Sequence, residues 1–192
     1  MSKNFDPRTT TLLIFISAVA ALRVIFNFNP EISLLANFSP VGAMAIFGGT
    51  YFNKRWKAFV FPLLMLFISD FVLHQTVFRK YGNGFLYGGW YWVYGAFAAI
   101  TIVSSWILTK ITIQRFFLSV IVCVLIHWII TDLGVWIGSM IYPQTFKGFV
   151  ICLENAIPYE LRFLAGTLLY GITMFAVFEW MKRKYHALQT AE

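Results

Sequence analysis

The chain has 192 residues, of which 59% are hydrophobic and 12% are charged. A soluble domain has about 25% charged residues, so this composition excludes an ordinary soluble domain and favours a single membrane domain over residues 1–192. The net charge of +7 would suit nucleic-acid binding, but the positive residues stand between apolar runs and form no basic face. We therefore expect the lipid bilayer as a partner, and no nucleic acid.

Six apolar segments are predicted to be membrane helices, because backbone in lipid must satisfy its hydrogen bonds within the segment. The segments cover about residues 10–26, 40–52, 58–73, 89–108, 116–141 and 161–180. The first contains Ala18-Val19-Ala20, which looks like a signal-peptide cleavage site. Because its apolar run continues to Phe26, we expect a helix that is retained. The predicted fold is therefore an all-α polytopic bundle of six transmembrane helices.

The second segment, Pro40 to Phe52, is short for a membrane helix. It reaches ~20 Å against a hydrocarbon core of ~30 Å. Ser39 is expected to cap the helix, with Pro40 at its first position. Its glycines, Gly42, Gly48 and Gly49, predict either tight packing against neighbouring helices or close approach of a solute to the backbone.

Lysine and arginine predict the orientation of the bundle. Ten of them fall on one side of a six-helix topology: Lys3, Arg8, Lys54, Arg55, Lys57, Lys110, Arg115, Lys182, Arg183 and Lys184. Both termini are therefore expected in the cytoplasm, with the protein in the inner (plasma) membrane. The last outer connection, residues 142–160, is too apolar for a solvated loop and is expected to fold back onto the bundle.

Four ionisable residues lie toward the outer ends of apolar runs: Asp70, His74, His127 and Asp132. A carboxylate in a membrane helix costs ~2.5–3.5 kcal/mol on insertion scales, so each aspartate needs a partner or a function. One interpretation is a polar cluster that contacts a solute; the other is structural pairing with loop backbone or an arginine. These residue types also suit a divalent metal, but their spacing matches no catalytic signature. We expect no metal, no cofactor and no catalytic residue.

Several further residues are candidates for the outer pocket. Arg23 is expected to snorkel or to pair with Asp70 or Asp132. Glu154 and Asn155, in the last outer connection, are predicted either to cover a pocket or to be solvated. The dense outer aromatics, including Trp90 and Trp136, indicate either an interfacial belt or a stacking surface for a solute.

Two other features concern packing. Cys123 and Cys152 belong to no CxxC or Cys/His motif, so they are predicted to be packed thiols. Ser17 and Ala21 place small residues on one face of the first helix, where another helix could approach closely, either from this chain or from another protein.

Several motifs resemble those of an uncharacterised bacterial family of integral-membrane proteins described as transport proteins. They are NFSPVGA at 37–43, Gly48-Gly49, Tyr51-Phe52, Ser69-Asp70, DLGVW at 132–136, YPQT at 142–145 with Gly148, and Ala156-Ile157-Pro158. The resemblance covers roughly residues 23–170. It implies a membrane transport protein.

That family is in turn similar to the S components of energy-coupling factor (ECF) vitamin transporters. The similarity implies six helices, an outer pocket for a vitamin or cofactor precursor, and association with a coupling subunit and two ATPases. Ser17 and Ala21 would then form the coupling face, although Ala20-Ala21 departs from a clean AxxxA pattern. The chain has no Walker A sequence, so we expect ATP hydrolysis, if used, to come from partners.

The first hypothesis is therefore solute binding in an outer-facing pocket, without enzymatic activity. The predicted solute contacts are Asp70, His74, Trp90, His127, Asp132, Trp136, Glu154 and Asn155. One alternative is an intramembrane Asp/His metal-dependent enzyme. Another is a membrane assembly protein that transports nothing.

Overall fold

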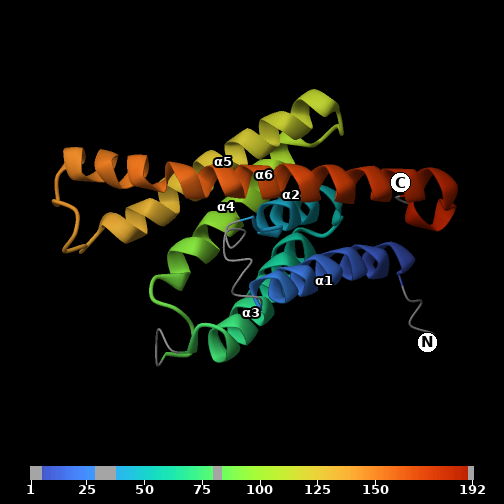
Figure 1. The fold of residues 1–192 in the computed structure, drawn as a ribbon. Coiled ribbons are helices and arrows are strands. Elements are labelled where there is room, and N and C mark those ends of the chain that lie inside the picture. The colour runs from blue at the N-terminus through green and yellow to red at the C-terminus, as the bar shows by residue number, and fades with distance from the viewer. Residues whose placement is uncertain (1–5, 29–37, 80–83, 190–192) are drawn as a thin grey trace.

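The computed structural model describes residues 6–28, 38–79 and 84–189. Within these residues the chain is all-α. The helices are α1 (Pro7–Asn27), α2 (Val41–Tyr51), α3 (Arg55–Thr76), α4 (Trp90–Ile107), α5 (Ile113–Trp136) and α6 (Phe146–Lys184), followed by a short 3-10 helix, η3 (His186–Leu188). Figure 1 shows α2 in the centre of the bundle, with the longer helices around it.

Five of these helices, all except α2, are long and apolar enough to cross a membrane. The protein is therefore a polytopic helical membrane bundle. The prediction of six transmembrane helices holds for five of them, and the sixth element is the short α2. The motif residue Asn37 lies outside the described residues, as do Lys3 and most of the connection between α1 and α2.

Side-chain caps define where several helices begin. Asp6 accepts from the backbone N–H of Arg8 at 3.2 Å, and Pro7 follows it at the first position of α1. Thr112 and Thr145 cap α5 and α6 in the same way. The predicted start of α2 was wrong by one residue, since Pro40 is the N-cap and Ser39 accepts from the Val41 N–H at 3.4 Å.

Helix α2 forms the core of the bundle. All but one of its eleven residues are buried, as expected for a helix that is apolar on every side. Its glycines face three different helices: a Cβ on Gly42 would meet Thr167 of α6, one on Gly48 would meet Pro62 of α3, and one on Gly49 would meet the Thr101 carbonyl of α4. These three contacts correspond to close helix packing, one of the two roles that the sequence predicted for the glycines.

Both ends of the described chain lie at the same end of the bundle (Figure 1). Arg8 of α1 donates to the backbone carbonyls of Leu188 at 2.8 Å and Tyr51 at 2.9 Å. Lys57 donates to Thr9 at 3.1 Å, which places the start of α3 there too. We call this the cationic end, defined by Arg8, Lys54, Arg55, Lys57, Lys110, Arg115, Lys182, Arg183 and Lys184. That it faces the cytoplasm stays a prediction from the positive charges.

Helix α6 corrects the prediction for the last outer connection. Residues 146–160 are not a loop folded over the bundle; they are the first turns of a single 39-residue helix that passes through Pro158. At 1.5 Å per residue this helix is about 58 Å long, well beyond a hydrocarbon core of about 30 Å. Figure 1 shows α5 and the start of α6 as a hairpin that extends to the left of the bundle.

Candidate functional site

Asp70 on α3 is the centre of a closed polar cluster. Its Oδ1 accepts from Arg23 Nη1 of α1 at 2.6 Å, and the Asp70 side chain is only 1% exposed. Its Oδ2 accepts from the hydroxyls of Tyr87 at 3.2 Å and Tyr94 at 3.1 Å. Arg23 Nη1 also donates to Ser69 at 2.6 Å. We call these five residues, Arg23, Ser69, Asp70, Tyr87 and Tyr94, the Asp70 cluster.

The Asp70 cluster compensates its own charge. The guanidinium neutralises the carboxylate, and both carboxylate oxygens have donors. Burial, and after it the nearby Asp70 carboxylate, raises the pKa of Tyr87, so its hydroxyl stays a donor at physiological pH. One turn later on the same helix face, His74 is buried with Nε2 3.0 Å from the Gly84 carbonyl oxygen. His74 therefore attaches the connection before α4 to the cluster.

A second polar site joins α5 to α6. His127 Nδ1 lies 2.8 Å from Glu160 Oε1. The His127 ring stacks on Phe163 with a centroid distance of 4.2 Å and also contacts Phe97 at 5.5 Å. Unlike Asp70, Glu160 has one carboxylate oxygen without a partner: Oε2 is buried and has no hydrogen bond within the described residues. We call His127 and Glu160 the His127–Glu160 pair.

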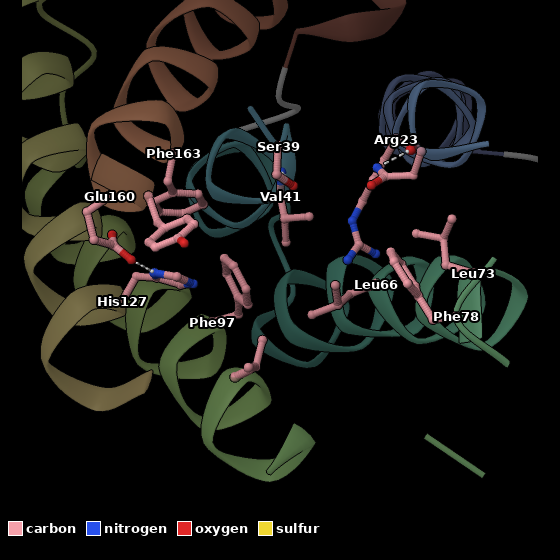
Figure 2. Close-up of a pocket in the computed structure, with 13 residues that line it drawn as sticks. Arg23, Ser39, Val41, Leu66, Leu73, Phe78, Phe97, His127, Glu160 and Phe163 are labelled. Carbon is pink, nitrogen blue, oxygen red and sulfur yellow. Dashed lines mark hydrogen bonds and ion pairs between the residues drawn. The ribbon is translucent and has the colours of Figure 1, made fainter. Parts of the chain in front are cut away.

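A cavity of about 270 Å³ lies between the Asp70 cluster and the His127–Glu160 pair. Figure 2 shows Arg23 on one side of it and His127 with Glu160 on the other, with Val41, Leu66 and Phe97 between them. Its lining residues are Arg23, Asn27, Ser39, Val41, Leu66, Leu73, Phe78, Val93, Phe97, His127, Tyr159, Glu160 and Phe163. Ionisable groups within a membrane bundle commonly mark a solute or ion pathway, so this cavity is the candidate site.

Comparison with known proteins identifies a family for this chain. A model of a family of unknown function, DUF6580, matches residues 3–188. The chain belongs to this family. No curated protein and no solved structure matches the chain.

For this DUF6580 member, the structure separates the predicted solute contacts. His127 lines the cavity, whereas Asp70 lies behind Arg23 in its own cluster. Asp132 is buried between α5 and α6, where the Cys152 thiol lies 3.8 Å from its Oδ1. Thus the four ionisable residues do not form one cluster. The expectation of an arginine partner for Asp70 is confirmed.

The remaining predicted contacts lie away from the cavity. Trp90 is exposed at the start of α4. Trp136 donates to the Pro143 carbonyl at 2.9 Å and holds the turn between α5 and α6. Glu154 and Asn155 are exposed on the outer part of α6, where Asn155 Nδ2 lies 3.4 Å from the Tyr142 hydroxyl.

Sequence reasoning placed two cavity residues in other roles. Arg23 was treated as a structural partner, but it also lines the cavity. Glu160 was placed in a loop, and its position on α6, three residues before Phe163, directs it to His127. The apolar character of residues 146–160 fits a continued helix, and it could have placed Glu160 on α6 from the sequence. In the described part of the chain, no group of three His, Cys, Asp or Glu side chains could hold a metal ion.

Proposed function

We propose that this protein binds a small solute in the cavity between the Asp70 cluster and the His127–Glu160 pair, and moves it across the membrane. The observation that carries the proposal is that Glu160 lines the cavity and has a buried carboxylate oxygen, Oε2, with no hydrogen-bond partner among the described residues. A buried carboxylate oxygen without a donor costs free energy, and a native structure keeps such an atom where a ligand, a water or a proton completes it.

The two sides of the cavity favour different parts of a solute. Glu160 would accept from a cationic or hydrogen-bond-donating group. On the other side, the hydrogen bonds of Arg23 to described residues leave from Nη1, so Nε and Nη2 remain as donors toward an acceptor group. The walls between them, including Val41, Leu66 and Phe97, are apolar. A volume of about 270 Å³ lies just below the usual range of roughly 300–1,000 Å³ for ligand pockets, so the solute is small.

The proposal is for binding without chemical conversion. The ionisable groups around the cavity are engaged in pairs, Arg23 with Asp70 and His127 with Glu160. Asp132, the other carboxylate that a metal-dependent mechanism would need, lies beside Cys152. We therefore favour a solute of the vitamin or cofactor-precursor class over the alternative of an Asp/His metal enzyme.

Energy for transport is proposed to come from partner subunits of the ECF type, a coupling protein and ATPases, in the inner membrane. Within this chain, Ser17 lies against α3, with its hydroxyl 3.7 Å from Met65 Sδ. Ala21 is exposed on α1 and leaves room for close approach of a partner helix. Gentle purification followed by identification of stably bound subunits tests this part separately.

The solute site is tested by native mass spectrometry of gently purified protein and of Glu160→Gln. We expect the wild type to carry a small molecule, and Glu160→Gln to retain it at least tenfold more weakly, because the variant loses the charged acceptor. Glu154→Gln is the matched control: it removes a carboxylate from the same helix, at an exposed position away from the cavity. Arg23→Lys keeps a cation beside Asp70 while removing the guanidinium donors.

Two outcomes would contradict the proposal. If Glu154→Gln weakens retention as much as Glu160→Gln does, the cavity is not the binding site. If the wild type carries no small molecule but forms a stable complex with other membrane proteins, the assembly role replaces transport.

A further inference from the structure

A second hollow lies at the cationic end, on the surface where α5 begins and α6 ends. It has a volume of about 440 Å³ and lies between residues 111–117 of α5 with its cap and residues 172–183 of α6. Phe116 and Phe175 form its floor, packed edge to face with a centroid distance of 5.1 Å. Ile113 and Ile172 form its rim, 77% and 49% exposed. In Figure 1, α5 crosses α6 obliquely and diverges from it toward the start of α5.

The floor and rim of this groove belong to the lipid-facing surface. Along α6, the exposed residues before Glu179 at this groove are Ile172, Thr173, Ala176 and Val177. The Thr173 hydroxyl donates to the Leu169 carbonyl of its own helix at 2.9 Å, so its polar group is satisfied within α6. In a bilayer such a crevice is filled by a hydrocarbon chain, because water cannot satisfy its walls. An acyl chain is therefore the ligand chemistry that suits this groove.

The polar end of the groove is positively charged. Arg183 lines it and forms no ion pair with any described residue. Glu179 lines it too, but its Oε1 already accepts from the Tyr51 hydroxyl at 2.8 Å and from Lys182 at 3.0 Å. The Thr112 hydroxyl oxygen accepts from the Arg115 N–H at 3.3 Å, which leaves its own proton free to donate. The net charge at the polar end of the groove is therefore positive, which favours binding of an anion.

We propose that this groove binds one anionic phospholipid, with an acyl chain over Phe116 and Phe175 and the phosphate at Arg183 and Thr112. The site is distinct from the solute cavity, because the two hollows share no lining residue. Basic pockets between membrane helices on the positively charged side bind anionic headgroups by this combination of apolar depth and surface charge.

The proposal is tested with delipidated protein in detergent, titrated with phosphatidylglycerol or phosphatidylcholine that have the same acyl chains. Native mass spectrometry measures the retained lipid. We expect the wild type to retain the anionic lipid several-fold better. Arg183→Gln should lower that retention about fivefold, the effect of one surface cation, and leave phosphatidylcholine unchanged. Lys184→Gln is the matched control, because its ammonium lies over the Trp180 and Tyr185 rings, 5.3 and 5.6 Å from their centroids.

A filling variant tests the apolar part of the site. Ala176 is exposed on the groove wall, so Ala176→Leu and Ala176→Phe should displace both lipids in order of side-chain size, with little change in melting temperature. The proposal is overturned if Lys184→Gln acts as strongly as Arg183→Gln, if the wild type holds both lipids equally, or if the folded filling variants retain phosphatidylglycerol unchanged.

Discussion

Two buried carboxylates flank the same cavity, and they differ in how completely their oxygens are bonded. Both oxygens of Asp70 have donors, three in all from Arg23, Tyr87 and Tyr94. Glu160 has His127 on one oxygen and no described donor on the other. Removing a carboxylate whose two oxygens are both bonded leaves its donors unpaired. Removing a carboxylate with one unbonded oxygen breaks fewer hydrogen bonds. The comparison predicts a stabilising role for Asp70 and supports the proposed ligand-binding role of Glu160.

The largest expected effect is that of Asp70→Asn on stability. The variant leaves the Arg23 guanidinium without its carboxylate, and breaking a buried pair from one side costs about 3–5 kcal/mol in the free energy of unfolding. Thermal and denaturant unfolding in detergent measure it. A loss no greater than that in the exposed control, Glu154→Gln, would remove the structural half of the comparison.

Gly42→Ala should come next. A Cβ at Gly42 would meet Thr167 of α6 and lie 2.8 Å from the ring of Phe163, which stacks on His127. Overpacking of this kind costs about 1–3 kcal/mol, and the displaced ring should also weaken solute retention. Gly95→Ala is the control, because its Cβ would have open space, and there unfolding should change by less than about 1 kcal/mol. Equal effects of the two variants would contradict the packing argument.

Tyr87→Phe is expected to cost about 1–2 kcal/mol, since it removes one of two phenol donors to the Asp70 carboxylate. Tyr91→Phe, at an exposed position, is the control and should be near neutral. Comparing the free energies of unfolding of these two variants at neutral pH tests whether Asp70 needs each of its donors.

The same variant has a pH signature. Burial and then Asp70 raise the pKa of Tyr87 above its ordinary value, so the folded protein keeps the phenol neutral while the unfolded chain ionises. The stabilisation is therefore complete below about pH 10 and falls as the pH rises through the raised pKa. Wild-type stability should drop more steeply above pH 10 than that of Tyr87→Phe. Parallel profiles would contradict the burial of this phenol.

The smallest effect on stability is expected for Glu160→Gln, within about 1 kcal/mol of the wild type. The amide keeps an acceptor for His127 and removes a buried charge with an unpartnered oxygen. Unfolding of the solute-free protein measures this value. A loss as large as that of Asp70→Asn would show that Glu160 is structural and would end the distinction between the two carboxylates.

The sequence predicted the carboxylates more readily than their surroundings. Asp70 and His127 stand out in apolar runs, and pairing of Arg23 with Asp70 was one of the alternatives expected from the charges. Glu160 was misplaced because residues 142–160 were expected to be a connection that folds back onto the bundle, whereas residues 146–160 begin α6. The predicted positions of Trp136, Glu154 and Asn155 relative to the cavity depended on where α6 begins. The single error in the start of this helix therefore made several predicted contacts wrong.

By itself, the sequence determined that the chain is a helical membrane protein, roughly where its helices lie, and that ten of its 15 lysine and arginine residues are expected at one end. These properties follow from local apolar content and from charges at helix ends, and neither depends on distant residues. Only the tertiary structure decided that Arg23 pairs with Asp70, while Glu160 lines a cavity and has one oxygen without a described partner. That pairing depends on the depth and rotation at which α1, α3, α5 and α6 pack around α2. A shift of one residue along a helix changes the direction of the side chain by about 100°, which is enough to move it out of the cavity.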